Sequence, residues 1–424
     1  MTTRQDALAL DARDPLAALR AQFSLPEDVI YLDGNSLGVL PTATPARVAA
    51  AVQDEWGSGL IRSWNSAGWV DLPQRVGDKI GRLIGAGPGQ TLAADSTSVN
   101  LFKVLSAALA IVKSGGDTQR RVIVSERSNF PTDLYIAESL ARQHGFTLQL
   151  VEPDEIAAQF DSSLAVLMLT HVNYRTGRMH DMAALTRAAH ACGALALWDL
   201  AHSAGAVPVD LLGADADFAV GCGYKYLNGG PGAPGFLWVN PRQLERMERD
   251  GLWQPLAGWF GHAAPFEFSP HYRPAAGIVR FSCGTPPVLG LTALEVGVDT
   301  LLAAESLGGM AALRRKSLAL TCHFITLVEK HCAGHGLSVI TPRTEGERGS
   351  QVNLARADGA YAIVQALIAR GVIGDFRAPD NLRFGFTPLY TRFVDVWDAV
   401  EHLRQVLDTG EWKEARFHQK AAVT

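Results

Sequence analysis

Two short apolar runs near the middle of the chain each end in an ionisable residue. The run from Ala194 to Trp198 stops at Asp199, and the run from Asp217 to Tyr224 stops at Lys225. A buried lysine between two tyrosines is tuned toward a nucleophilic amine, which a Schiff-base lysine requires. A carboxylate one or two strands away can keep a pyridine nitrogen protonated, so the pair is the minimum set for pyridoxal phosphate (PLP). A half-exposed ion pair at two strand ends is the alternative.

The elements around these residues predict an α/β fold. Apolar runs bounded by turn residues predict buried parallel strands, and ligands of open α/β sheets gather at the carboxyl ends of such strands. Further strands are predicted at Arg121–Ser125 and Leu164–Leu169, and a helix at Ala183–Cys192 leads back to the Asp199 run. This alternation is typical of a mostly parallel sheet with helices on both faces. We therefore expect Asp199 and Lys225 at the rim of one crevice.

Three hydroxyl residues, Ser96 to Ser98, stand where an extended segment turns into the apolar helix Leu101–Lys113. A helix start binds phosphate through its first backbone N–H groups and its dipole, and Thr97 and Ser98 would add hydroxyl donors. Capping of the helix needs only one such residue and is the alternative.

An aromatic residue and a carboxylate follow the strand that ends at Ser125. Phe130 and Asp133 lie in Asn129-Phe-Pro-Thr-Asp, directly before a helix predicted from Leu134. Phe130 fits either a hydrophobic staple or a ring that lies flat on a planar cofactor, with Asp133 as its polar neighbour.

Other candidate residues also have a purely structural interpretation. Asn35 and Ser36 stand between glycines and fit a turn. The tryptophans at 56, 64 and 69 lie on a stretch without a clean period, which we expect to be an irregular loop that covers a pocket or packs under the next helix. Arg383, on a predicted strand, fits a surface or ion-paired arginine.

Composition and charge exclude several classes of function. The 424 residues carry 38 Lys and Arg against 43 Asp and Glu, a net charge of -5 without long runs of either sign, so nothing predicts binding to nucleic acid or an anionic membrane. No stretch approaches the roughly twenty apolar residues of a membrane span. The five cysteines form no CxxC pair, which predicts a reducing cytoplasm. The Cys and His residues between 322 and 335 fall on a predicted amphipathic helix and its end, so we expect no metal site.

The length predicts a large domain and a smaller one. We predict an N-terminal segment at residues 1–40 that packs on both domains, a large α/β domain at 41–287, and a small α+β domain at 288–424. The small domain has strand candidates at Leu337–Thr341, Gln351–Ala355 and Asn381–Phe386 and a last helix at Val394–Leu407. No GxGxxG follows the first strand with an acidic residue about twenty positions on, which argues against a dinucleotide site.

A series of motifs runs in order across nearly the whole chain: YLDGNSLGVLP, DSTSVNLF, NFPTD, NYRTG, DLAHSAG, YKYLNGGPG, GWFGH, SCGTPP and LRFGFTPLYTRF. Each motif alone is weak, whereas the whole series in order is specific. On these motifs the chain resembles the aminotransferase class V group of fold type I PLP enzymes, and within that group the bacterial kynureninase family. The resemblance implies a large domain built on a mostly parallel, seven-stranded sheet, with PLP as cofactor.

The resemblance also implies a reaction. Enzymes of this kind are hydrolases that cleave the Cβ–Cγ bond of L-kynurenine, with 3-hydroxykynurenine as a second candidate substrate, to anthranilate or 3-hydroxyanthranilate and L-alanine. The resemblance implies a role in tryptophan degradation and NAD biosynthesis, in the cytoplasm. It also implies a homodimer with shared active sites, because residues of the partner subunit would complete the phosphate cage. Among alternatives in the same fold, an aminotransferase stays open, whereas a cysteine desulfurase-like lyase would lack its thiolate in Arg383-Phe-Gly-Phe-Thr-Pro.

By the same resemblance, each candidate residue receives a role. Lys225 would form the Schiff base and move the Cα proton, Asp199 would pair with the pyridinium nitrogen, and Tyr224 would complete the phosphate cage. The other implied cofactor-binding residues are Thr97, Ser98, Phe130, Thr132, Asp133, Thr170 and His202, together with Trp259 and Thr285 from the partner subunit. Arg383 would hold the substrate's α-carboxylate as a bidentate fork. Trp64, Asn35 and Ser36 would face its aryl side.

One further role concerns the oxyanion that develops at Cγ when water adds. A site for this step needs one or two hydrogen-bond donors near Cγ. Tyr224 and Ser36 are our hypotheses for that donor.

Overall fold

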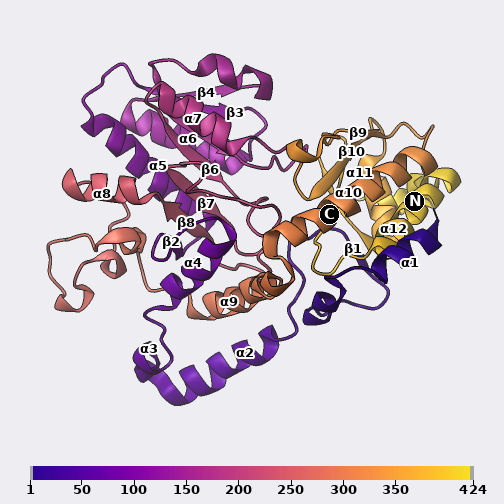
Figure 1. The fold of residues 1–424 in the computed structure, drawn as a ribbon, viewed down its shortest axis with the longest axis horizontal. Coiled ribbons are helices and arrows are strands. Elements are labelled where there is room, and N and C mark those ends of the chain that lie inside the picture. Colours follow the sequence, from indigo (N-terminus) through magenta and orange to yellow (C-terminus); the bar gives the residue numbers. More distant parts are fainter. Residues whose placement is uncertain (1–2, 421–424) are drawn as a thin grey trace.

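The computed structural model describes residues 3–420 of the chain, which fold into two lobes (Figure 1). A seven-stranded sheet with the order β2-β8-β7-β6-β5-β3-β4 forms the centre of the first lobe. Neighbouring strands from β7 to β4 pair in parallel, and β8 runs antiparallel to both β7 and β2. The expected mostly parallel sheet is therefore confirmed. The strands are β2 (Thr91–Ala93), β3 (Val122–Glu126), β4 (Thr147–Val151), β5 (Leu164–Thr170), β6 (Leu195–Asp199), β7 (Phe218–Gly221) and β8 (Phe236–Val239).

Helices cover both faces of this sheet because its central strands are apolar on both sides. In β6, Ala196 and Trp198 face one hydrophobic core, whereas Leu195 and Leu197 face another, as the two-residue period of a strand requires. The first core is closed by α4 (Leu72–Leu83), α7 (Met182–Ala191) and α9 (Val288–Leu302). The second is closed by α5 (Thr97–Ser114), α6 (Pro131–His144) and α8 (Pro241–Arg249).

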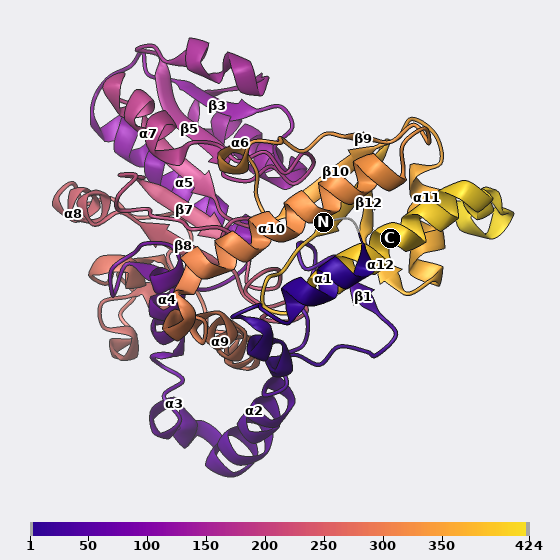
Figure 2. The ribbon, with the colours of Figure 1, turned by 45° about the vertical axis from the view of Figure 1, so that its right-hand side comes forward.

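The second lobe is built on a smaller antiparallel sheet with the order β12-β13-β10-β9. Its strands are β9 (Ser338–Val339), β10 (Gln351–Ala355), β12 (Asp375–Arg377) and β13 (Asn381–Gly385), and its helices are α1 (Arg4–Asp11), α10 (Gly309–His331), α11 (Ala360–Ala369) and α12 (Phe393–Thr409). A separate pair joins β1 (Ile30–Tyr31) to β11 (Val372–Ile373) in parallel. Figure 2 shows α10 running from the first lobe into the second.

The N-terminal segment contributes to both lobes. Leu16 and Leu19 lie in the first core of the large lobe, and Ala7 and Leu32 lie in the core of the small lobe. The helix α9, which follows the predicted boundary at residue 287, packs in the first core. The domain limits proposed from the sequence stay predictions.

One part of the local prediction was wrong. The tryptophan-containing stretch expected to be an irregular loop is helical: α2 (Thr44–Ala50) continues into a π-helical segment at Ala51–Gly59, and α3 (Ser63–Ser66) follows. This arm extends away from the body of the large lobe (Figures 1 and 2).

The helix α5 is, by length and composition alone, long and apolar enough to cross a membrane, although the sequence analysis expected no such stretch. It is mostly buried, in the core between the sheet and α6, which is the environment of a core helix. No group of three or more His, Cys, Asp and Glu side chains able to hold a metal ion occurs within residues 3–420.

Candidate functional site

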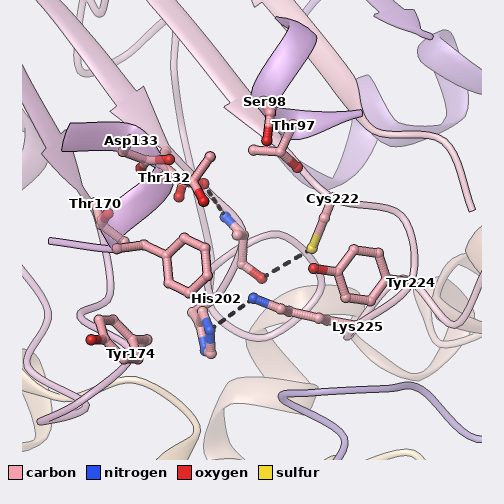
Figure 3. Close-up of a pocket in the computed structure, with 13 residues that line it drawn as sticks. Thr97, Ser98, Thr132, Asp133, Thr170, Tyr174, His202, Cys222, Tyr224 and Lys225 are labelled. Atoms are coloured by element: carbon pink, nitrogen blue, oxygen red, sulfur yellow. Dashed lines mark hydrogen bonds between the residues drawn. The ribbon is translucent and has the colours of Figure 1, made fainter. Parts of the chain in front are cut away.

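The carboxyl ends of the central parallel strands meet at one pocket (Figure 3). Thr170 at the end of β5 pairs in register with Asp199 at the end of β6, and Asp199 pairs with Val220 on β7. Lys225 lies a few residues beyond β7, because that strand ends at Gly221 and not at the lysine as expected. The residues that line the pocket are Thr97, Ser98, Phe130, Thr132, Asp133, Thr170, Tyr174, Asp199, Ala201, His202, Cys222, Tyr224 and Lys225.

Two buried carboxyl groups, those of Asp199 and Asp133, lie next to each other on one wall of the pocket. They share a side-chain hydrogen bond, and burial raises the pKa of both groups. The backbone N–H of Ala201 donates to Asp199 Oδ1 at 2.7 Å. Within residues 3–420 no Arg, Lys or His side chain comes within 4.0 Å of either carboxylate, so the two groups lack the cation that buried carboxylates require.

The amine of Lys225 lies in the same pocket without an ion-pair partner among the described residues. Its Nζ lies 3.0 Å from His202 Nε2 and 5.7 Å from the centroid of the Tyr224 ring. Burial, together with the positive charge of Lys225, lowers the pKa of His202 well below its usual range. The simple strand-end ion pair between Asp199 and Lys225 does not form, so a nucleophilic amine remains free beside a neutral imidazole.

Tyr224 presents its hydroxyl to the same space. Burial, followed by the proximity of Cys222, raises the pKa of this phenol to about 12. The Cys222 thiol itself is buried beside Lys225 and lies 3.7 Å from the carbonyl oxygen of Ala201. Tyr224 therefore keeps its proton near neutral pH and can act as a hydrogen-bond donor.

The first turn of α5 also borders the pocket, through Thr97 and Ser98. The Ser96 hydroxyl caps the helix by accepting the N–H of Val99 at 3.3 Å. Capping therefore accounts for Ser96, but Thr97 and Ser98 line the pocket from the first turn, as a phosphate site requires. No described residue accepts a hydrogen bond from the backbone N–H of Thr97 or Ser98. The backbone packs tightly here, since a Cβ at Gly235 would lie 2.9 Å from Thr97 N.

An aromatic pair borders the pocket between the strands β3 and β5. Phe130 is the N-cap of α6, not the preceding residue that a hydrophobic staple uses, and its ring is 44% exposed. It meets the Tyr174 ring edge to face, with the centroids 5.4 Å apart. A half-exposed ring at a pocket wall fits the stacking interpretation of Phe130.

The predicted substrate-binding arginine lies outside this lining, between the two lobes. Arg383 is buried, and its Nε and Nη2 donate to the Asp375 carboxylate at 2.7 and 2.5 Å. Its Nη2 also donates to Ser36 Oγ at 2.8 Å, and its Nη1 donates to the carbonyl oxygen of Tyr174 at 3.1 Å. Ser36 thus belongs with the arginine. The amide of Asn35 is buried next to Gly385 with no hydrogen-bond partner among the described residues.

Besides Arg383, Ser36 and Asn35, three further predicted site residues are absent from the described lining of this pocket: Trp64, Trp259 and Thr285. The two tryptophans belong to a separate aromatic cluster at the surface. Phe260 joins them, with its ring centroid 6.0 Å from that of Trp64 and 4.9 Å from that of Trp259. Thr285 is exposed. Within one chain the structure does not bring these residues to Lys225.

The sequence analysis missed four residues of the site: Tyr174, Ala201, Cys222 and Asp375. Cys222 and Ala201 neighbour residues that were predicted, so the motif positions alone could have included them. Tyr174 stands in the NYRTG motif but had no separate chemical signal. Asp375 lies on β12, a strand that the sequence analysis did not predict.

The side chains of this pocket fit PLP. The amine of Lys225 can bind an aldehyde, and the unpaired Asp199 and Asp133 carboxyls fit a protonated ring nitrogen. The first turn of α5 fits a phosphate. These three features lie in one pocket, and neither the amine nor the carboxyl pair has an ion-pair partner within the described chain.

Comparison with known sequences gives a consistent family. A kynureninase from Pseudomonas fluorescens is 57% identical to this chain over 427 residues, which cover 100% of both proteins. A kynureninase from Burkholderia pseudomallei is 56% identical over 427 residues with the same complete coverage. The pattern of the kynureninase C-terminal domain matches residues 313–403.

Comparison with solved structures concerns the fold. An apo cysteine desulfurase from Thermococcus onnurineus superposes with a TM-score of 0.76 at 17% identity, covering 92% of this chain and 98% of that chain. A C-DES variant with glycine covalently linked to its PLP cofactor gives a TM-score of 0.75 at 17% identity, with the same coverage. The two-lobed architecture is therefore that of PLP enzymes of fold type I.

Proposed function

The chain belongs to the kynureninase family, PLP-dependent hydrolases that cleave the Cβ–Cγ bond of L-kynurenine, and we propose that the pocket around Lys225 is where this reaction occurs. The observation that carries the proposal is the meeting of a free amine, an unpaired buried carboxyl pair and an open helix start in one pocket. The full-length similarity to kynureninases does not favour the aminotransferase alternative.

The cofactor would be held by three groups of side chains. Lys225 would bind its aldehyde carbon, Asp199 with Asp133 behind it would face the ring nitrogen, and Thr97 and Ser98 would hold the phosphate. When bound, PLP supplies an electron sink for the carbon atoms next to the substrate's amine nitrogen. Burial raises the pKa of both aspartates, and repulsion from Asp199 raises the pKa of Asp133 further. A ring N–H⁺ would favour the charged form of the pair.

Lys225 is the residue placed to move the Cα proton. A lysine acts as a base only when its amine is uncharged, and His202 Nε2, which is 3.0 Å away and stays neutral, can accept a hydrogen bond from that amine. Tyr224, which keeps its phenolic proton, is the donor we assign to the oxyanion that forms at Cγ when water adds to the ketone. Ser36 is a weaker candidate, because its hydroxyl is engaged with Asp375 and Arg383.

Arg383 is the residue we assign to the substrate's α-carboxylate. Asp375 occupies the Nε–Nη2 edge of the guanidinium, which leaves the Nη1–Nη2 edge for a second carboxylate. That edge now donates to the Tyr174 carbonyl and to Ser36. A substrate carboxylate would therefore replace contacts made between the two lobes. Asn35, buried and unpartnered beside this group, is assigned to the aryl side of the substrate.

A homodimer is part of the proposal because one face of the chain exposes an unusual amount of apolar surface. The π-helical segment and the turn after it contribute Trp56 and Leu60, and the aromatic cluster contributes Phe266 and Phe268, all more than half exposed. An apolar groove adjoins them, lined by Trp56, Trp69, Pro286, Pro287, Val288, Leu289 and Gly290. Patches of this kind mark protein interfaces. A second copy seated here would bring Trp259, Thr285 and Trp64 toward a site they do not reach within one chain.

Localisation and pathway also belong to the proposal. All five cysteines are unpaired, which supports a reducing compartment such as the cytoplasm. The products assigned here, anthranilate or 3-hydroxyanthranilate and L-alanine, place the reaction in tryptophan degradation, with supply of NAD biosynthesis as the further step.

The experiment that tests the function is a steady-state assay of the PLP-loaded protein with L-kynurenine and with 3-hydroxykynurenine. Release of fluorescent anthranilate in equal amount to L-alanine is the expected result, and comparison of kcat/KM for the two substrates gives the preference. Formation of a keto acid without alanine would instead identify an aminotransferase.

A further inference from the structure

Gln351 lies behind the pocket, on the strand β10 of the small lobe, and is fully buried. Its side-chain amide spans the gap between the lobes. The amide Nε2 donates to the carbonyl oxygen of Tyr174 at 2.9 Å and to that of Asn173 at 3.3 Å. The amide Oε1 lies 2.9 Å from His202 Nδ1. Gln351 is the residue of the small lobe that touches the histidine beside Lys225.

These contacts determine which way the amide points. A backbone carbonyl can only accept a hydrogen bond, so the group that faces Asn173 and Tyr174 must be the NH₂. The oxygen of Gln351 is then fixed toward His202. Since this oxygen can only accept, His202 must carry its hydrogen on Nδ1. A neutral histidine with Nδ1–H has a free lone pair on Nε2.

That lone pair is directed at the lysine. His202 Nε2 lies 3.0 Å from Lys225 Nζ, so the chain of contacts runs from Tyr174 through Gln351 and His202 to Lys225. The charged groups that face His202 are Lys225, Arg383 and Arg377, which are all cationic. Burial and these charges lower the pKa of His202, so the neutral form persists well below neutral pH. Within residues 3–420, no carboxylate is among the charged groups that shift the pKa of His202.

We propose that Gln351 is a positioning residue that fixes His202 as the Nδ1–H tautomer and so reserves His202 Nε2 as the acceptor for the amine of Lys225. This inference rests on the proposed function for its effect on turnover, but its structural part concerns only the chain. Histidines at functional sites often have a hydrogen-bond partner that sets their tautomer, and loss of this partner commonly costs about 10- to 100-fold in activity.

Because Gln351 belongs to the small lobe, its contact with His202 links the position of the small lobe to the environment of the Lys225 amine. The carbonyl of Tyr174 accepts from Gln351 Nε2 and from Arg383 Nη1. A substrate carboxylate that takes Arg383 Nη1 leaves this carbonyl to Gln351 alone. Gln351 therefore keeps the Tyr174 loop and His202 in place while the arginine changes its partner.

The test uses nuclear magnetic resonance of the full-length protein without PLP, labelled with ¹⁵N at histidine, and with the His202→Asn variant to identify the His202 signals. Long-range ¹⁵N–¹H correlations distinguish the two neutral tautomers and the charged ring. We expect the Nδ1–H tautomer of His202 between pH 5 and pH 8. An Nε2–H tautomer or a charged ring at pH 7 would overturn the proposal whatever the enzyme's activity.

Two substitutions and one matched control complete the test. In Gln351→Glu, a carboxylate facing Nδ1 stabilises the imidazolium, so we expect a charged His202 at pH 7 and a kcat about 10- to 100-fold lower with KM changed less than threefold. In Gln351→Met, which cannot accept at Nδ1, the tautomer preference is lost.

The control is Asn381→Ala, because Asn381 Nδ2 donates at 2.5 Å to the carbonyl of Arg175 on the same loop but makes no hydrogen bond to Gln351 or His202. It should leave the His202 tautomer, kcat and KM unchanged. If Asn381→Ala alters the tautomer as much as Gln351→Met does, Gln351 acts only by holding the loop, and the proposal is wrong. If His202 of the unaltered protein is the Nδ1–H tautomer but the PLP-loaded protein does not cleave L-kynurenine, the result counts against the proposed function alone.

Discussion

The carboxyl groups of Asp133 and Asp199 share a hydrogen bond in the pocket, and burial raises the pKa of both. Asp133 comes from the first turn of α6 and Asp199 from the end of β6, so the pair is assembled by two elements distant in sequence. Two buried carboxyl groups without a cation are unfavourable unless one holds a proton or a positively charged ligand binds. The pair therefore fits a protonated ring nitrogen, the role that we propose for it.

Replacing Asp199 by Asn should remove most of the activity while the protein stays folded. The amide has the same shape but cannot balance the charge of a protonated ring nitrogen, so we expect kcat to fall by about 10²- to 10³-fold, as for other charge-stabilising groups. Steady-state assays with anthranilate fluorescence measure the change. Asp133→Asn is the matched control, with a smaller expected loss because Asp133 stands behind Asp199. A larger loss in Asp133→Asn would show that the two roles are reversed.

The hydroxyl of Tyr224 should matter for turnover much more than for cofactor retention. Tyr224→Phe removes a donor whose pKa is raised to about 12, and we expect kcat to fall by about 10²-fold with PLP affinity changed only a few-fold. PLP titration followed by absorbance, together with steady-state kinetics, separates the two quantities. Unchanged turnover in the variant would remove Tyr224 from the oxyanion step.

A further carboxyl group, Asp33, makes stability depend on pH. Burial, and then repulsion from Asp375, raises its pKa from 3.8 to about 7 in the folded state. The folded protein therefore holds a proton that the unfolded chain has lost. The stabilisation this proton provides is complete below the unfolded pKa and disappears as the pH rises through about 7.

Asp33→Asn removes this dependence, because an amide does not titrate. Relative to the unaltered protein, the free energy of unfolding of the variant should rise by about 2 kcal/mol between pH 5 and pH 8. Urea denaturation of the PLP-free protein at the two pH values measures the difference. A difference that is constant, or that falls with pH, would mean that Asp33 is ionised throughout.

The exposed apolar face should hold two chains together. Replacing Leu60 and Ile61, 57% and 77% exposed, with Glu places charges on the 3-10 turn that follows the π-helical segment, and we expect a shift from dimer to monomer with loss of activity. Light scattering after size exclusion gives the mass. Tyr135→Glu is the matched control, since Tyr135 is 67% exposed on α6, away from this face. A mass of one chain in the unaltered protein would exclude the shared site.

Residues placed by a single strand could be predicted from the sequence, because local pattern alone determines their position. The positions of Asp199, at the end of a buried run, and of the hydroxyl residues at the start of α5 both follow from one rule. In an open α/β sheet the carboxyl ends of parallel strands and the starts of the following helices lie at the same edge. The end of β7 could not be predicted in this way. The chain leaves the sheet after Gly221, and its backbone packs closely just beyond this point: a Cβ at Gly223 would lie 2.3 Å from the carbonyl oxygen of Pro234.

Contacts between strands and between lobes could not be predicted from local pattern. Asp375 faces Arg383 from the neighbouring strand of the small sheet, and Gln351 reaches His202 from the other lobe. The first contact depends on how two strands pair and the second on how the two lobes are placed against each other, and no spacing in the sequence records either. The structural alternative for Arg383, an ion-paired arginine, also proved partly right, because its guanidinium is paired with Asp375.

The most direct measurement of the central claim is reduction of the PLP-loaded protein with borohydride, followed by mass spectrometry of its peptides. We expect a visible absorption band that borohydride bleaches and a reduced pyridoxyl group attached at Lys225, with neither seen in Lys225→Ala. A protein that stays colourless when supplied with PLP, or a label at another lysine, contradicts it.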